Sequence, residues 1–111
     1  MGSRGKTMVG AVLAAVSMVA LAAAPASAAT ADLSRTCGGV KTYYDAYSSR
    51  TLVYTQKTGT SCAGHAWVRV KTNGTWKKWI HNNSKATISN STGNFQGSQH
   101  KSCETCTVKT L

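Results

Sequence analysis

The sequence predicts an all-β fold: a small disulfide-stapled β sandwich or barrel of about five to six short strands, after an N-terminal signal helix. Three observations support this prediction. The N-terminus has the layout of an export signal, four cysteines follow it, and short β-type segments then recur about every ten residues. We divide the chain into a cleavable signal peptide at 1–28, a flexible leader at 29–36 and a single β domain at 37–111.

The N-terminal segment has the three parts of a secretory signal peptide. Arg4 and Lys6 precede an uncharged run of about 18 residues, from 7 to 24, and the Ala-Ser-Ala cleavage site at 26–28 follows. A membrane anchor is the alternative, but the run is short, contains Ala and Ser, and has no basic stop-transfer cluster behind it. We therefore predict cleavage after Ala28 and a secreted, extracellular product without a transmembrane anchor.

The mature part of the chain has few aliphatic residues for a core. Of its 83 residues, 11 are Leu, Ile, Val or Phe, about 13%, which is below the roughly 20% expected of globular chains. Seven Tyr and Trp residues offer large areas to bury instead. Cysteines in an exported chain favour covalent cross-links. We predict two disulfides among Cys37, Cys62, Cys103 and Cys106, and all three pairings stay open.

Short segments rich in Val, Thr and Tyr alternate with Gly, Asn and Ser along the mature chain. This punctuation is typical of strands joined by tight turns. No window shows a sustained helical period. The candidate strands are 40–47, 51–58, 61–71, 75–80, 85–89 and 105–111.

The segment on either side of Asn73-Gly74 is a candidate hairpin. If its loop has three residues, 72–74, with the glycine in a left-handed bulge position, then Val70 faces Trp76 and Trp67 faces Trp79. This register places apolar residues on one face and polar ones on the other. We favour it for that reason.

The alternative is a two-residue type I′ turn at 73–74. Every pairing then shifts by one, so that Trp76 meets Lys71 and Trp67 meets Ile80.

One face of the favoured hairpin combines indoles with cations. Indoles offer flat area for stacking on sugars or bases, and the cations would hold phosphates or carboxylates around them. The alternative is that a second sheet covers the indoles and the cations only rim the core. The candidate binding residues are His65, Trp67, Arg69, Lys71, Lys77 and Trp79.

The mature domain is strongly basic. Removing Arg4 and Lys6 leaves 11 cations against Asp32, Asp45 and Glu104, a net charge of about +8. Most cations have no acidic neighbour in the sequence. Such a balance favours partners such as anionic wall polymers, lipid headgroups or extracellular nucleic acid.

The residues of enzyme sites are scarce in this sequence. Cys103 and Cys106 have the spacing of a redox dithiol but lack the strand–helix context of one. Together with Cys62 and His65 they could instead be the four ligands of a zinc ion. Export to an oxidising compartment argues against this alternative. Cys62 and His65 alone are a poor nucleophile–base pair, because residues three apart on a strand point to opposite faces. We predict no enzymatic activity, no cofactor and no metal.

In the run 52–54, in Cys62 and in the run 67–70, the chain resembles an actinobacterial secreted domain of unknown function. In that domain an aromatic strand precedes a Cys that is followed closely by Trp-Ala-Arg-Val. The resemblance covers about 20 of 83 mature residues; here 56–61 lengthens the stretch before the Cys and Val68 replaces the Ala. The chain thus resembles the small cysteine-stapled proteins exported by Streptomyces and other actinobacteria, most of unassigned function. The resemblance implies export and a β fold, and carries over no catalytic residue.

We therefore expect a secreted, non-enzymatic, basic β protein that binds anionic or glycan surfaces such as cell-wall polymers. The alternative is a secreted antimicrobial or toxin-like antagonist, for which small size, positive charge and disulfides are equally suitable. The oligomeric state is left open.

Overall fold

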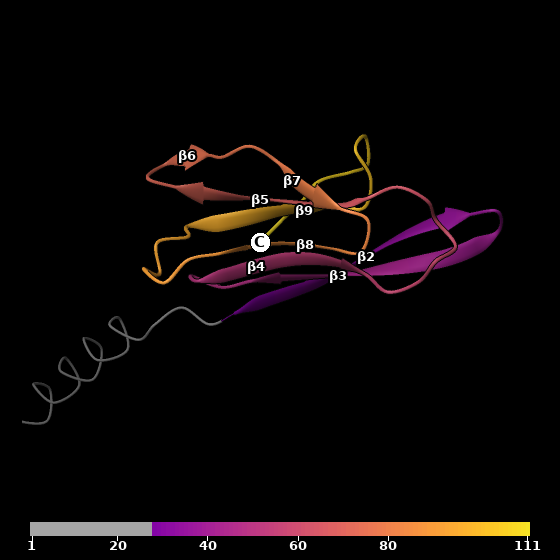
Figure 1. The fold of residues 1–111 in the computed structure, drawn as a ribbon, viewed down its shortest axis with the longest axis horizontal. Coiled ribbons are helices and arrows are strands. Elements are labelled where there is room, and N and C mark those ends of the chain that lie inside the picture. The colour runs from indigo at the N-terminus through magenta and orange to yellow at the C-terminus, as the bar shows by residue number, and fades with distance from the viewer. Residues whose placement is uncertain (1–27) are drawn as a thin grey trace, which may run out of the picture.

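The computed structural model describes residues 28–111, and within them the protein is all-β. The predicted signal helix, at 1–27, lies outside the described residues. No helix in the part of the chain that is described is long and apolar enough to cross a membrane. In this described part of the chain, nine strands form two antiparallel sheets that face each other, and Figure 1 shows them as two layers seen edge-on.

The first sheet, called here the N-terminal sheet, has the strand order β2-β3-β4-β8. Its strands are β2 (Ala29–Cys37), β3 (Val40–Ser48), β4 (Leu52–Lys57) and β8 (Lys85–Ser89). All three neighbouring pairs are antiparallel, so tight turns suffice to join β2 to β3 and β3 to β4.

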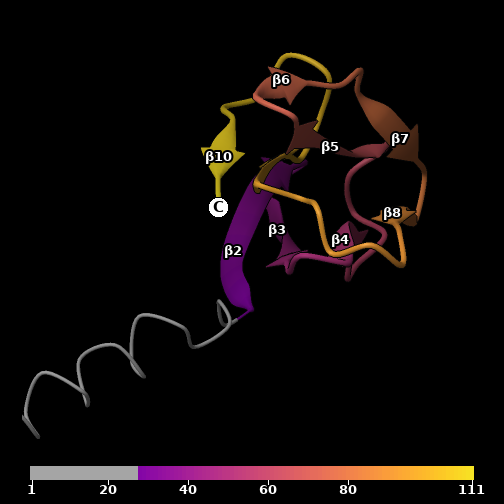
Figure 2. The same cartoon turned by 90° about the vertical axis from the view of Figure 1, so that its left-hand side faces the viewer.

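The second sheet, called the tryptophan sheet, has the order β10-β9-β5-β6, and β7 also pairs with β5. Its strands are β5 (Ala66–Thr72), β6 (Thr75–Trp76), β7 (Ile80–Asn82), β9 (Gly97–Lys101) and β10 (Lys109–Thr110). In Figure 2, β7 and β8 lie together at one side of the two layers, while β2 and β10 lie at the other.

The segment 29–36, which we expected to be a flexible leader, is ordered as strand β2. It pairs residue for residue with β3 through the turn at Gly38 and Gly39, whose φ angles of 60° and 80° suit glycine. Alternate residues such as Leu33 and Arg35 are half-buried, whereas those between them are exposed. The prediction was wrong because short polar residues at a chain end do not reveal a partner strand.

The other strand predictions differ in quality. Those at 40–47, 51–58 and 85–89 are confirmed within one residue. The segment predicted at 61–71 becomes a strand only from Ala66, since the residues before it form an irregular loop.

Two predictions at the C-terminal end were wrong. The strand expected at 75–80 is divided into β6 and β7, and that expected at 105–111 is reduced to β10. Strand β9 was not predicted, because the sequence Gly-Ser-Gln-His-Lys at 97–101 has no alternating apolar residues.

The hydrophobic core lies between the two sheets and is small. Its buried members are Val53, Val68, Val70, Ala86 and Phe95. They come from strands of both sheets and from the loop before β9, and each strand member points inward by the two-residue alternation of a strand.

Polar residues complete the interior around His100, whose side chain is fully buried. Its Nδ1 lies 2.8 Å from Thr55 Oγ1, and its Nε2 lies 2.6 Å from Ser98 Oγ. Because the Thr55 hydroxyl donates its one proton to Trp67 O, Nδ1–H must donate to Thr55, and Nε2 accepts from Ser98. Burial lowers the pKa of His100 from 6.5 to about 4. A hydrogen bond to the backbone of Tyr54 raises this pKa, but by less than burial lowers it.

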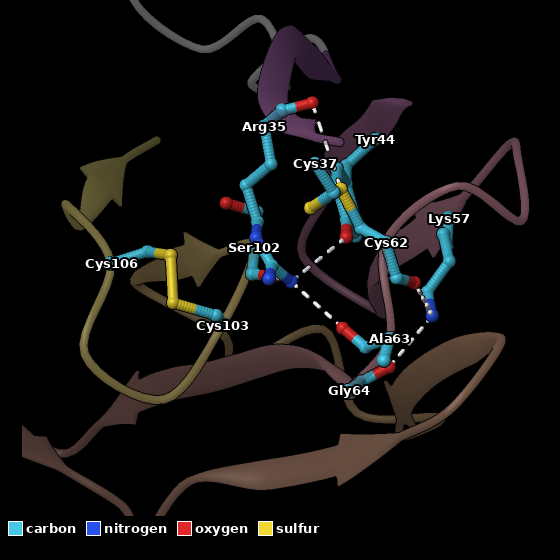
Figure 3. The surroundings of a disulfide bond; sticks show 10 residues. All are labelled: Arg35, Cys37, Tyr44, Lys57, Cys62, Ala63, Gly64, Ser102, Cys103 and Cys106. Atoms are coloured by element: carbon cyan, nitrogen blue, oxygen red, sulfur yellow. Dashed lines mark hydrogen bonds between the residues drawn. A yellow bond between two sulfur atoms is a disulfide. The ribbon is translucent and has the colours of Figure 1, made fainter. Parts of the chain in front are cut away.

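Two disulfides cross-link the fold, as predicted, and the structure decides their pairing as Cys37–Cys62 and Cys103–Cys106. The first joins the β2–β3 hairpin to the loop before β5 (Figure 3). All four sulfurs are used, so the alternative zinc set with His65 does not form. Disulfides of this kind indicate an oxidising environment.

Arg35 reinforces this end of the molecule. Its guanidinium donates to Ala63 O at 3.0 Å and to Ser102 O at 3.2 Å, and contacts the Tyr44 hydroxyl at 3.5 Å. The sticks in Figure 3 show the side chain reaching from β2 to both carbonyls. One cation thus ties an edge strand of one sheet to loops at the end of the other.

Candidate functional site

The candidate site lies on the outer face of the tryptophan sheet and begins with the hairpin at Asn73-Gly74. Both residues have positive φ, 51° and 75°, and Lys71 pairs with Trp76 across them. This is the two-residue turn that we had placed second. The favoured three-residue loop was wrong, because Asn-Gly can adopt the left-handed angles of a type I′ turn at both positions.

The hairpin does not keep this register along its length. Lys77 N donates to Val70 O, which continues it, but Val68 then pairs with Ile80 and Trp67 with His81. The outer strand therefore contains one extra residue between β6 and β7, as in a β-bulge.

The bulge brings Trp76 and Trp79 to the same guanidinium. Trp76 faces Lys71 on the outer face, although the favoured register had placed it on the apolar face opposite Val70. Trp79 lies in the bulge, so two indoles three positions apart both contact Arg69.

The outer face carries a continuous stack of aromatic and cationic side chains, which we call the cation–π ladder. Arg69 Cζ lies 5.2 Å from the ring centre of Trp76 and 4.7 Å from that of Trp79. Lys101 Nζ lies 4.3 Å from Trp79 and 4.9 Å from Trp67. These distances are within the range of cation–π attraction. In order, the ladder consists of Trp76, Arg69, Trp79, Lys101, Trp67, His81 and His65.

Two histidines extend the ladder beyond Trp67. The His81 ring stacks on Trp67 with 4.1 Å between ring centres, and its Nδ1 lies 2.7 Å from Nδ1 of His65. At that distance one imidazole donates a hydrogen bond to the other.

Hydrogen bonds fix the cations of the ladder in place. Arg69 Nε donates to Gln99 Oε1 at 2.8 Å, and Lys101 Nζ donates to Glu104 O at 2.7 Å. Lys101 is 9% exposed, so its charge is held against the indoles rather than extended into solvent. Sequence reasoning missed Lys101 because it lies in the unpredicted strand β9.

The indoles are half-buried, and no second sheet within residues 28–111 covers them. The N-terminal sheet packs on the other side of the tryptophan sheet, where Ala66, Val68 and Val70 are buried. The alternative of covered indoles is therefore wrong. Of the other predicted residues, Lys71 Nζ lies 5.8 Å from the ring centre of Trp76. Lys77 is exposed and has no cation–π contact among residues 28–111.

The charges of the two sheets differ. Asp32 and Asp45 face each other across β2 and β3 in the N-terminal sheet. Glu104, in the loop after β9, is exposed. The strands of the tryptophan sheet themselves contain cations and no carboxylate, so the ladder faces solvent with an excess of positive charge.

A polar hollow of about 700 Å³ lies beside the histidine end of the ladder. Its lining includes Lys57, His65, Asn83 and Ser84. The Lys57 ammonium is already held by two backbone carbonyls of the loop at 62–64. Among the described residues, no three His, Cys, Asp or Glu side chains converge as a metal site would require.

No known protein family, curated protein or solved structure matches this chain.

Proposed function

We propose that this protein is secreted and binds the anionic polymers of a cell wall through the cation–π ladder, a role that requires no catalysis. The observation that supports this most directly is the position of Arg69 between Trp76 and Trp79. A cation held between indoles presents its remaining N–H groups at a defined position. Little side-chain entropy is then lost when an anion binds.

The composition of the face favours a phosphate- or carboxylate-bearing polymer. Lys71 lies at the Trp76 end of the ladder, and the strands of its sheet contain no carboxylate that could pair with it. The half-buried indoles offer apolar area for the sugar or glycerol units between successive anionic groups. An extended polymer could thus contact cations and indoles alternately along the ladder.

The test compares two single variants that remove the same charge. Lys71→Gln acts at the ladder, and Lys41→Gln acts on the N-terminal sheet. Binding is measured on isolated cell wall, before and after extraction of its phosphate polymers, over a range of salt concentrations. We expect the ladder variant to bind about fivefold more weakly, since each cation near an anionic surface contributes about 1 kcal/mol.

The matched control should stay within about twofold of the natural protein, because attraction from the opposite sheet is screened over about 10 Å. Extraction of the phosphate polymers should remove most of the binding. Equal losses in both variants would show that net charge alone drives retention. Retention on extracted wall would point to neutral glycan instead. Either result contradicts the proposal.

A further inference from the structure

The two disulfides have different structural roles. Cys37 and Cys62 are 25 positions apart, and Cys62 is 1% exposed. Cys103 and Cys106 are three positions apart, and both are half-buried. Because the stabilisation by a cross-link grows with the loop that it closes, the shorter one constrains the chain far less. Its sulfurs are also the more open to reagents.

The loop at 102–106 has supports other than its disulfide. Arg35 donates to Ser102 O at 3.2 Å, and Lys101 donates to Glu104 O at 2.7 Å. A backbone bond of 3.2 Å between the two cysteines closes the turn itself. The loop should therefore keep its shape when the sulfur–sulfur bond opens.

These same contacts hold both sequence neighbours of Cys103 in place. The carbonyls of the residues before and after it each accept a hydrogen bond from a cation, Arg35 and Lys101. The hydroxyl of Thr105 lies 3.8 Å from Cys103 Sγ. A hydroxyl that donates to the sulfur stabilises a thiolate, whereas the exposed Glu104 carboxylate opposes this through water. Cys103 is thus the better leaving sulfur.

Cys106 is the sulfur that an incoming thiol would reach. It lines a hollow of about 310 Å³ together with Leu33, Arg35 and Thr107. Attack there directs the electron pair of the broken bond toward the stabilised sulfur of Cys103. This arrangement matches the order of thiol–disulfide exchange, in which the sulfur with the more stable thiolate leaves.

We propose that Cys103 and Cys106 form a redox-active couple that oxidises dithiols of extracellular peptides. The peptide's first thiolate attacks Cys106 Sγ, and the Cys103 thiolate leaves. The peptide's second thiolate then attacks the peptide sulfur of this mixed disulfide and releases the Cys106 thiolate. The peptide leaves as a disulfide, and its two protons pass to the two cysteines. Oxidised glutathione restores the protein disulfide by the reverse exchange.

The first experiment treats the oxidised secreted protein with reduced glutathione, then quenches with acid, alkylates the free thiols and measures masses of the peptides. We expect Cys103–Cys106 to open on the order of 100-fold faster than Cys37–Cys62, with unchanged tryptophan fluorescence. Equal rates for the two bonds, or loss of the folded signal on opening of the first, would overturn the proposal.

A matched pair of variants tests the leaving sulfur. Thr105→Val removes the hydroxyl near Cys103 and should slow opening about threefold, whereas Thr87→Val, at an exposed position of β8 in the other sheet, should not. Equal rates in the two variants would refute the assignment of Cys103. With oxidised glutathione present, the natural protein should speed oxidation of a synthetic two-cysteine peptide, and Cys103→Ala with Cys106→Ala should not. A natural protein that leaves this rate unchanged would refute the activity.

Discussion

The guanidinium carbon of Arg69 lies 4.7 Å from the ring centre of Trp79, a residue that a bulge in the neighbouring strand brings onto the same face. Arg69 also contacts the ring of Trp76 and is the central cation of the ladder. The bulge, a local irregularity of the backbone, thus helps to form the surface that we propose binds anions.

Replacing Arg69 by Ala should lower the free energy of unfolding by about 1 to 2 kcal/mol, because two cation–π contacts and one hydrogen bond to Gln99 are lost. Urea unfolding followed by tryptophan fluorescence measures this change. Lys78→Ala serves as the control, since Lys78 is exposed and should alter stability by less than about 0.5 kcal/mol. Equal effects of the two substitutions would show that the ladder adds nothing to stability.

Two buried threonines should respond in opposite directions to Thr→Val. The Thr42 hydroxyl is buried and has no hydrogen-bond partner among residues 28–111, so Thr42→Val should stabilise the fold by about 1 kcal/mol. The Thr55 hydroxyl bonds both Trp67 O and His100, so Thr55→Val should cost about 2 to 3 kcal/mol. Thermal unfolding of both variants measures the two signs, and destabilisation by Thr42→Val would contradict the prediction.

Stability should fall in mild acid because of His100. Its pKa is lowered by burial to about 4 in the folded state, against 6.5 for an ordinary histidine. The unfolded chain therefore binds the proton first, so this contribution is complete above pH 6.5 and is lost as the pH falls toward 4. The loss should reach about 3 kcal/mol.

The measurement is urea unfolding at intervals between pH 4 and pH 7. His100→Gln keeps an uncharged hydrogen-bonding side chain between Thr55 and Ser98, and should flatten the pH dependence over this range. An equally steep dependence in this variant would assign the acid sensitivity to other groups.

Removing either disulfide should destabilise the fold, by unequal amounts. Cys37→Ala with Cys62→Ala should cost about 3.5 kcal/mol, and Cys103→Ala with Cys106→Ala about 2, because the first closes a much longer loop. Denaturant unfolding of the two double variants gives the comparison. A larger cost for the second pair would mean that the C-terminal loop needs its cross-link to stay folded.

Much of the fold could be predicted from local signals. Alternating residues and turn residues identified β3, β4 and β8 within one residue. Strand β9 could not be found in this way, since Ser98 and His100 are polar residues that face inward. Hydrogen bonds make that burial favourable, and the one between His100 and Thr55 joins residues that are 45 positions apart in the sequence.

The candidate site was predicted in part. His65, Trp67, Arg69, Lys71 and Trp79 lie on or beside one ladder as expected, whereas Lys77 does not stack on an indole. Separation of apolar and polar faces favoured the wrong register, because a bulge at a sheet edge lets the strand change its alignment partway. The Asn-Gly turn was the more reliable signal, since its φ angles are a local property of two residues.

The sequence by itself determined the all-β class, the presence of two disulfides and the residues of the hairpin, because strand alternation, turn chemistry and cysteine number are local or compositional properties. Only the tertiary structure decided which cysteines pair, that 29–37 forms a strand, and that Lys101 lies between Trp67 and Trp79. Each of these depends on which distant segments become neighbours. That choice follows from the register of whole strands and the packing of two sheets, which no local pattern specifies.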